Sequence, residues 1–155
     1  MTQIASIVYK PEGMPVPENQ YLRVELDEAV LVAGHGIEGD LKGGHPDRQL
    51  NVMSYETLTN LRAQGFYTEP GQMGEQIVLH QLDVDHLPAG ARVQLGSSAV
   101  IEVVKPRTGC AHFSQIQGKP VALVQEQMGV MARVLTGGII RVGDPVKVLK
   151  PEHHV

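Results

Sequence analysis

Cys110 is the only cysteine in this 155-residue chain, and the residues around it favour its chemistry. Arg107 lies three residues before it, Lys105 precedes Arg107 by two, and His112 follows two residues after the cysteine. Nearby cations favour the thiolate, which is the form that attacks electrophiles and binds soft metals. A lone cysteine is also commonly a small buried apolar residue. The residues alone leave both interpretations of Cys110 open.

A glycine-rich segment, residues 34–39 (GHGIEG), matches the letters of the dinucleotide-binding pattern G-x-G-x-x-G. The residues that follow it, 40–46 (DLKGGHP), cannot open the helix that would hold a pyrophosphate. We therefore predict a turn after a strand, with Asp40 bonded to nearby backbone amides. The alternative is that this loop, with His45, Asp47 and Arg48, forms one wall of a ligand site.

Two other candidates, a possible metal site and a possible serine nucleophile, have less support from their sequence context. His80, Asp83, Asp85 and His86 include metal-ligating types, but their spacing matches no closed metal site, so a polar loop is the better interpretation. Ser54 lacks the G-x-S-x-G context of a hydrolase nucleophile and is expected to accept a capping hydrogen bond at a helix start.

The elements that must position these residues are mostly strands. Short apolar and β-branched runs between turn residues predict strands at 4–9, 24–33, 50–53, 76–79, 92–95, 99–104, 130–135, 139–142 and 146–149. Helices are predicted at 54–62 and, with a weaker pattern, at 120–127. Many strands without intervening helices predict a mainly β fold, a closed or nearly closed β-barrel, because closure removes exposed strand edges.

Composition limits the class of protein. The length predicts a single domain over residues 1–150, with residues 151–155 as a frayed tail. A net charge of −4 argues against binding nucleic acid, and no run approaches the roughly 20 apolar residues of a membrane span. One cysteine excludes an intramolecular disulfide framework, so we expect a cytoplasmic protein. The oligomeric state stays open.

A set of ordered motifs resembles the MOSC domain, the family named for the C-terminal domain of molybdenum cofactor sulfurases. The matching positions run along nearly the whole chain: Gly36-x-x-Gly39-Asp40, Arg48-Gln49, Pro70-Gly71-x-x-Gly74-Glu75, Gly90-x-x-Val93-x-x-Gly96, Pro106-Arg107-x-x-Cys110, Arg133-Val134-x-x-Gly137-Gly138 and Gly143-Asp144. The resemblance implies a barrel-like β fold that binds the molybdenum cofactor. It also implies that the motif cysteine, here Cys110, carries sulfur or ligates molybdenum.

The chain departs from the family pattern at two places. Gly109 stands where the family commonly has proline before the cysteine, which gives this loop more conformational freedom. The family's Gly-Glu-Asn is here Gly74-Glu75-Gln76, which keeps an amide on a longer side chain. The chain has no aminotransferase-like domain, so no pyridoxal phosphate site is expected in it alone.

The resemblance assigns site residues by their chemistry. A pyranopterin cofactor carries a phosphate and a metal, which require cationic or amide donors and a soft ligand. Cys110 is the predicted molybdenum ligand or sulfur carrier, and the residues predicted to bind or support the cofactor are Gly39, Asp40, Arg48, Gly74, Glu75, Gln76, Arg107, His112 and Arg133. Among these, Asp40 and Glu75 are expected to orient arginines or bind backbone amides, because a carboxylate would repel a phosphate.

Three functional hypotheses follow from the resemblance. The first is a molybdenum-dependent oxidoreductase that reduces N-hydroxylated compounds with electrons from a separate donor. The second is a sulfur transferase in which Cys110 receives a persulfide from a separate cysteine desulfurase. The third is a non-catalytic carrier of the cofactor. A barrel kept for protein contacts, with an inert cysteine, is the remaining structural alternative.

Overall fold

The computed structural model describes residues 1–13, 22–109 and 111–150. The predicted cofactor ligand Cys110 and the predicted tail, residues 151–155, lie outside the described residues. Within the described part of the chain, no helix is both long enough and apolar enough to cross a membrane.

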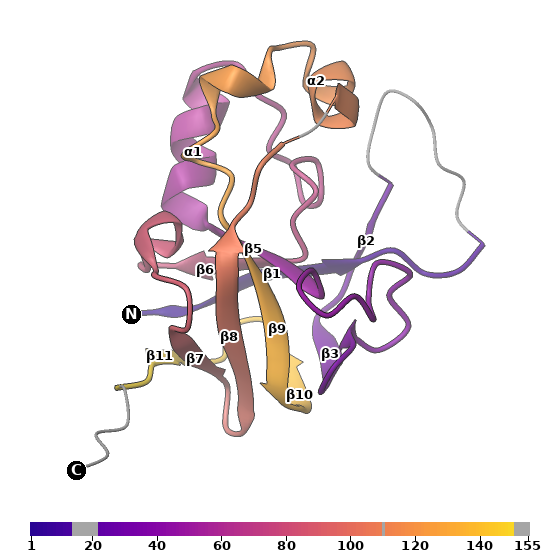
Figure 1. Ribbon diagram of the computed structural model, residues 1–155, viewed down its shortest axis with the longest axis vertical. Coiled ribbons are helices and arrows are strands. Elements are labelled where there is room, and N and C mark those ends of the chain that lie inside the picture. The colour runs from indigo at the N-terminus through magenta and orange to yellow at the C-terminus, as the bar shows by residue number, and fades with distance from the viewer. Residues whose placement is uncertain (14–21, 110, 151–155) are drawn as a thin grey trace.

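One curved sheet contains most of the strands (Figure 1). Its order is β11-β7-β8-β9-β5-β6-β1-β2, and its pairs are antiparallel except for the parallel pair β5 and β6. The bounds are β1 Gln3–Tyr9, β2 Val24–Glu25, β5 Leu50–Ser54, β6 Ile77–His80, β7 Arg92–Leu95, β8 Ala99–Pro106, β9 Val130–Thr136 and β11 Val146–Val148.

Hydrogen bonds between residues 2–4, at the start of β1, and residues 144–146, at the start of β11, bring opposite sides of this sheet together. The amide of Ile4 donates to the carbonyl of Asp144 over 2.9 Å, and the amide of Val146 donates to the carbonyl of Thr2 over 3.0 Å. A bridge between Gln3 and Pro145 lies between these two bonds. The prediction of a mainly β, nearly closed barrel is therefore confirmed.

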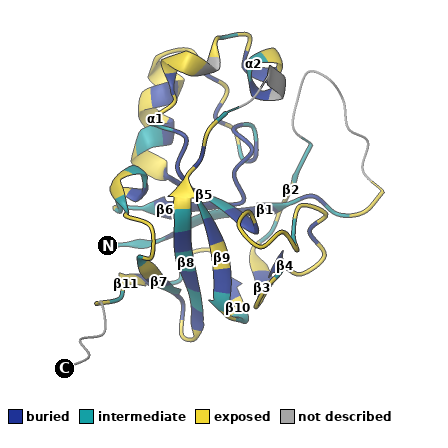
Figure 2. Ribbon diagram, in the orientation of Figure 1, coloured by how far each residue is buried: buried dark blue, intermediate teal, exposed yellow. Residues whose placement is uncertain are grey.

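A second sheet of three strands packs beside β8 and β9 (Figure 1). It contains β3 Glu28–Val32, β4 Gly36–Ile37 and β10 Gly138–Arg141, in the order β10-β3-β4. Alternate residues of β3, Ala29 and Leu31, enter the main apolar core, which Figure 2 shows as the dark interior of the sheets. The predicted continuous strand at 24–33 is wrong, because the chain passes from one sheet to the other between β2 and β3.

Two helices cover one end of the barrel (Figure 1). They are α1 Tyr55–Ala63 and α2 Ala111–Gln117, and short 3-10 turns occur at Val84–His86 and Val121–Leu123. Leu58 and Leu61 of α1 pack with Phe113 in a second apolar cluster, which also contains Met53, Phe66, Met73, Val78, Val124 and Met128. This cluster holds the helices and the 66–75 loop together at that end.

The predictions for the helical segments were partly wrong. The helix at 54–62 is confirmed as α1, but the helix at 120–127 is reduced to one 3-10 turn, and α2 was not predicted. Ser54 does not cap α1 with its side chain. Its hydroxyl instead donates to the carbonyl of Leu82 and accepts the amide of Val84 over 2.8 Å. Ser54 is the last residue of β5, and its side chain therefore bonds the segment that follows β6 and does not bond α1.

Candidate functional site

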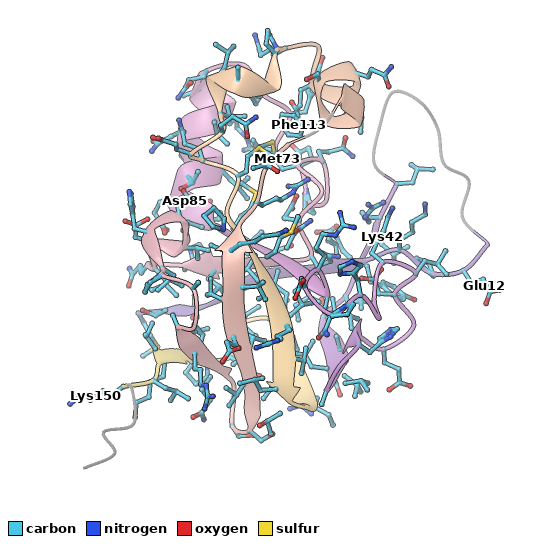
Figure 3. The ribbon with its side chains drawn as sticks, in the orientation of Figure 1. Glu12, Lys42, Met73, Asp85, Phe113 and Lys150 are labelled. Atoms are coloured by element: carbon cyan, nitrogen blue, oxygen red, sulfur yellow. The ribbon has the colours of Figure 1, made fainter. Side chains whose placement is uncertain are left out.

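A cavity of about 460 Å³ opens where β5, β9 and several loops meet. The residues around it come from five separate parts of the chain and are Arg23, Leu41, Lys42, His45, Arg48, Asn51, Gly74, Gln76, Arg107, Thr108 and Met131. Figure 3 shows Lys42 on the loop between β4 and β5, which forms one side of this region. The volume lies within the range of small-molecule sites.

The cavity is cationic although the chain as a whole is acidic. Its lining includes three arginines, one lysine and one histidine, and none of the described lining residues is Asp or Glu. Close to it, burial lowers the pKa of Lys10, and the charges of Lys42 and Arg23 lower it further. Burial is the largest cause of this shift, and the smaller contributions of Lys42 and Arg23, which Asp40 opposes, are those of neighbouring positive charges. The cavity is therefore suited to an anionic ligand.

Asp40 holds the loop that carries Lys42 in place through hydrogen bonds to backbone amides. Its buried carboxylate accepts the backbone amides of Lys10 over 3.1 Å and Lys42 over 3.2 Å. It also accepts Nε2 of Gln76 over 3.3 Å. The predicted bonding of Asp40 to nearby amides is confirmed, and Gly39 directly precedes it in the same turn. Asp40 thus orders the lining residues without itself lining the cavity.

Asn51 and Gln76 connect β5 to the segment before β6. Oε1 of Gln76 accepts the backbone amide of Asn51 over 2.6 Å, and the amide of Gln76 donates to the carbonyl of Asn51 over 2.9 Å. Nδ2 of Asn51 donates to the carbonyl of Gly74 over 3.1 Å. Because Gly74, Gln76 and Asn51 all line the cavity, these bonds fix one wall of it.

Arg107 reaches the cavity from the end of β8. Its side chain is buried, and Nη1 donates to the carbonyl of Met73. Its backbone amide donates to the carbonyl of Gly129 over 3.0 Å. The guanidinium is thereby held at both its backbone and its side chain, which reduces the entropy lost when a ligand binds.

Glu75 orders the loop that Arg107 contacts. Its carboxylate accepts the amides of Gly71 over 2.7 Å and Met73 over 3.1 Å and is almost fully buried. Burial raises the pKa of Glu75, whereas these hydrogen bonds and the charge of Arg107 oppose the rise. Glu75 therefore acts on the site through the loop and Arg107, as expected for a carboxylate that does not contact a phosphate.

Arg133 lies away from the cavity, in contrast to its predicted role. On β9 the alternating residues Val130, Ala132 and Val134 are buried, so Arg133 points outward. Its Nε donates to Glu102 on β8 over 3.0 Å, and Arg92 contacts the same carboxylate at 3.3 Å. The hydrogen bond from Arg133 is the largest cause that lowers the pKa of Glu102. This arginine belongs to a surface ion-pair network.

Some of the remaining predicted site residues line the cavity, and others lie outside the described residues. Arg48 lines the cavity together with Arg107, Gly74 and Gln76. Cys110 lies outside the described residues, as does the side chain of His112. Thr108, two residues before the cysteine, lines the cavity.

The prediction of a polar loop for His80, Asp83, Asp85 and His86 holds only for Asp83, because His80 ends strand β6 and the other two lie in the 3-10 turn Val84–His86. Among the described residues no group of three or more His, Cys, Asp or Glu side chains could hold a metal ion. Nδ1 of His86 lies 2.6 Å from Asp83, whose hydrogen bond raises the pKa of the exposed imidazole. Asp85 accepts the hydroxyl of Thr57 over 3.0 Å and the amide of Gly129 over 2.7 Å. Asp85 thus anchors the residue that in turn binds Arg107.

Four polar lining residues, Arg23, Lys42, Asn51 and Thr108, were not among the predicted site residues. Asn51 carried a usable signal, because it is the one polar residue in the run Leu50–Met53 predicted as a strand. Lys42 follows Asp40 in the glycine-rich segment that was considered as a ligand wall. Arg23 gave no comparable signal, since its place depends on how β2 pairs with β1.

Comparisons with known proteins agree with this architecture. The family model of the MOSC domain matches residues 40–147, which include every lining residue except Arg23. No curated protein matches the chain. The fold is similar to those of three solved structures, which are 18 to 20% identical to this chain.

The solved structures match over almost all of this chain. YuaD from Bacillus subtilis superposes with a TM-score of 0.74 at 18% identity, covering 96% of both chains. YiiM from Geobacillus stearothermophilus gives a TM-score of 0.72 at 20% identity and covers 97% of this chain and 76% of its own. YiiM from Escherichia coli gives 0.67 at 20% identity, covering 100% of this chain and 73% of its own.

Proposed function

The chain belongs to the MOSC domain family, and on that premise we propose that its cationic cavity binds the molybdenum cofactor, with Cys110 as the molybdenum ligand or sulfur carrier. The observation that carries this proposal is the lining of the cavity. It combines several cationic side chains with an ordered amide wall and contains no carboxylate among the described residues. A phosphate-bearing organic cofactor needs donors of these kinds.

The donor set fits the two ends of such a cofactor. Arg48 and Arg107 would bind the phosphate, and Lys42 and Arg23 would add to the positive potential that attracts it. A thiolate at Cys110 would be the soft ligand for molybdenum. When bound, the cofactor supplies the redox chemistry of molybdenum.

The residues of this chain would prepare the site before a substrate arrives. Glu75 and Asp40 order the loops that carry Met73 and Lys42, while Met73 and Gly129 hold Arg107. A nearby guanidinium would favour the thiolate of Cys110, because the charged form is stabilised by an opposite charge. The protein's own hydrogen bonds already hold these side chains, so the site would be preorganised.

We favour reduction of N-hydroxylated compounds over the two alternatives. This activity needs a separate electron donor, because reduction of an N-hydroxyl group takes two electrons. The single thiol of this chain has no second thiol with which it could supply them by forming a disulfide. A persulfide carrier that receives sulfur from a cysteine desulfurase needs an accessible thiol but has no use for the cationic cavity. A pure carrier needs the cavity but not the thiol. A reducing cytoplasm suits each function of a free cysteine.

The three functions separate in one set of assays. Protein from a host that makes the cofactor is tested with a chemical reductant and an N-hydroxylated amidine, and separately for persulfide after incubation with a cysteine desulfurase. Reduction of the amidine that is lost in Cys110→Ser supports the oxidoreductase. Persulfide loading without reduction favours sulfur transfer. Cofactor content that is unchanged in Cys110→Ser, without either activity, leaves the carrier and removes Cys110 from the mechanism.

A further inference from the structure

We infer that Asn51 is the residue by which the cavity distinguishes a phosphate attached to a nitrogen heterocycle from a simple phosphate. This inference rests on the proposed function and assigns a role to a side chain within that site. It begins from the position of Asn51, which lines the cavity from strand β5. Its partner on β9, Met131, also lines the cavity.

The amide of Asn51 is held in one orientation. Its backbone N–H and C=O both bond to Gln76, and its side-chain Nδ2 donates to the carbonyl of Gly74. Within the described part of the chain, no hydrogen-bond partner meets Oδ1 of Asn51. The side chain therefore offers an acceptor whose direction is set before any ligand binds.

The other side chains of the cavity offer mainly donors. Arginine and lysine donate and cannot accept. The amide of Gln76 is engaged at both ends, by the amide of Asn51 at Oε1 and by Asp40 at Nε2. Thr108 carries a hydroxyl that can rotate to suit any partner. The imidazole of His45 already accepts the amide of Asp47 at Nδ1 over 3.1 Å. Among the described lining side chains, Asn51 is thus the oriented acceptor.

An oriented acceptor favours a ligand that carries N–H donors. Phosphate at neutral pH presents mostly acceptor oxygens, which bind the cations, so it gains less from Oδ1 of Asn51 than a ligand with N–H donors does. A pterin ring carries a ring N–H and an amino group, and either can donate to a fixed oxygen. A site built to bond an N–H group discriminates against ligands that lack it, because its own polar atom is then left unpaired.

The apolar lining lies beside this acceptor. The thioether of Met131 is adjacent to Asn51 across the β5–β9 pair, and Leu41 lines the cavity from the 38–49 loop. A polarisable thioether packs well against a planar ring. Cations for the phosphate, an acceptor for the N–H edge and an apolar surface for the ring are therefore all present in one cavity.

The test compares two probes by calorimetry, inorganic phosphate and neopterin monophosphate. Asn51→Leu keeps the branched shape of the side chain with a larger volume, Asn51→Ala truncates it, and both remove Oδ1 together with the Nδ2 donor to Gly74. Each variant should bind neopterin monophosphate roughly 3- to 10-fold more weakly than the wild type, which corresponds to one neutral hydrogen bond. Their affinity for phosphate should stay within about 2-fold, and this binding also reports that the cavity is folded.

Two control variants test whether the effect is specific to Asn51. Asn60→Ala, on the exposed face of α1, should leave both affinities unchanged. Arg48→Ala should weaken both probes. Equal losses for both probes in the Asn51 variants, or no loss for neopterin monophosphate, would overturn the inference while the cationic site stands. If the wild type binds neither probe, the proposed function fails together with it.

Discussion

Arg107 donates a hydrogen bond from Nη1 to the backbone carbonyl of Met73, which joins the end of strand β8 to the loop before β6. The same arginine lines the cationic cavity. One side chain therefore connects the segment that leads to Cys110 with the loop that Glu75 orders.

Replacement of Arg107 should weaken binding of a phosphate-bearing ligand. We expect Arg107→Ala to cost roughly 1 to 3 kcal/mol, or about 5- to 150-fold in Kd, because a charge-assisted contact is lost. Arg107→Lys should recover part of the affinity, since it keeps the charge but not the planar fork. Titration with neopterin monophosphate measures both changes.

The control for Arg107 is Arg133→Ala, which removes an arginine whose side chain bonds Glu102 outside the cavity. Its affinity for the ligand should equal that of the wild type. A loss as large as that of Arg107→Ala would mean that the two arginines act on binding through overall charge, and the assigned role of Arg107 would be wrong.

Glu75→Gln should destabilise the fold. Glutamine offers one oxygen where the carboxylate accepts both Gly71 and Met73, so one buried N–H loses its acceptor, and Arg107 loses a neighbouring negative charge. We expect a loss of roughly 1 to 3 kcal/mol in the free energy of unfolding by urea. Glu69→Gln is the matched control, because Glu69 is exposed and 3.5 Å from Arg62. Equal stability of the two variants would contradict this role of Glu75.

The network of Glu102 with Arg133 and Arg92 should make stability depend on pH. The hydrogen bond from Arg133 holds the pKa of Glu102 below its unfolded value of about 4.3. Its stabilisation is therefore complete above that value and is lost as pH falls through the folded pKa. Because both arginines are about half exposed, we expect at most about 1 kcal/mol.

Thermal unfolding of the wild type and Glu102→Gln between pH 7 and pH 2.5 measures this contribution. The difference in stability should be constant near neutral pH and should shrink toward zero at the acidic end. A difference that persists unchanged at the lowest pH would show that the carboxylate charge is not its source.

Gly129→Ala should be one of the most destabilising single substitutions in this region. Gly129 has a φ of +77°, and a Cβ there would lie 2.1 Å from the carbonyl oxygen of Val52. The left-handed backbone costs roughly 1 to 2 kcal/mol for alanine, and overpacking adds roughly 1 to 3 kcal/mol. Gly90→Ala is the control, because Gly90 has a φ of +89° with open space around it. The free energy of unfolding by urea should therefore be clearly lower for Gly129→Ala than for Gly90→Ala. Equal losses in the two variants would mean that backbone strain alone, and not the contact with Val52, causes the destabilisation.

Much of the barrel follows from local patterns in the sequence. Ala99, Ile101 and Val103 alternate with less buried residues along β8, and this period of two predicts a strand with one buried face. The same alternation on β9 puts Arg133 on the face opposite Ala132 and Val134, so the sequence predicts that its side chain leaves the core. Met131 shares that face and lines the cavity, so only the bond to Glu102 shows that Arg133 does not join the site.

Other features depend on contacts between distant residues. Helix α2 has few local signals, and it is held by Gln117, whose side chain bonds the backbone of Tyr67 over 2.7 Å and 2.9 Å and that of Gln72 over 3.1 Å. Phe113 and Ile116 are buried on the inner face of this helix. The cavity likewise joins Arg23 to Arg107, and no local pattern shows that two such separate segments meet.

The central claim is that this chain binds the molybdenum cofactor in the cationic cavity. The most direct test measures molybdenum by mass spectrometry, and oxidised pterin by fluorescence, in wild-type protein purified from a host that synthesises the cofactor. We expect molybdenum and pterin in equal amounts in the wild type, with both reduced in Arg107→Ala and unchanged in Arg133→Ala. Wild-type protein that carries neither molybdenum nor pterin from such a host would contradict it.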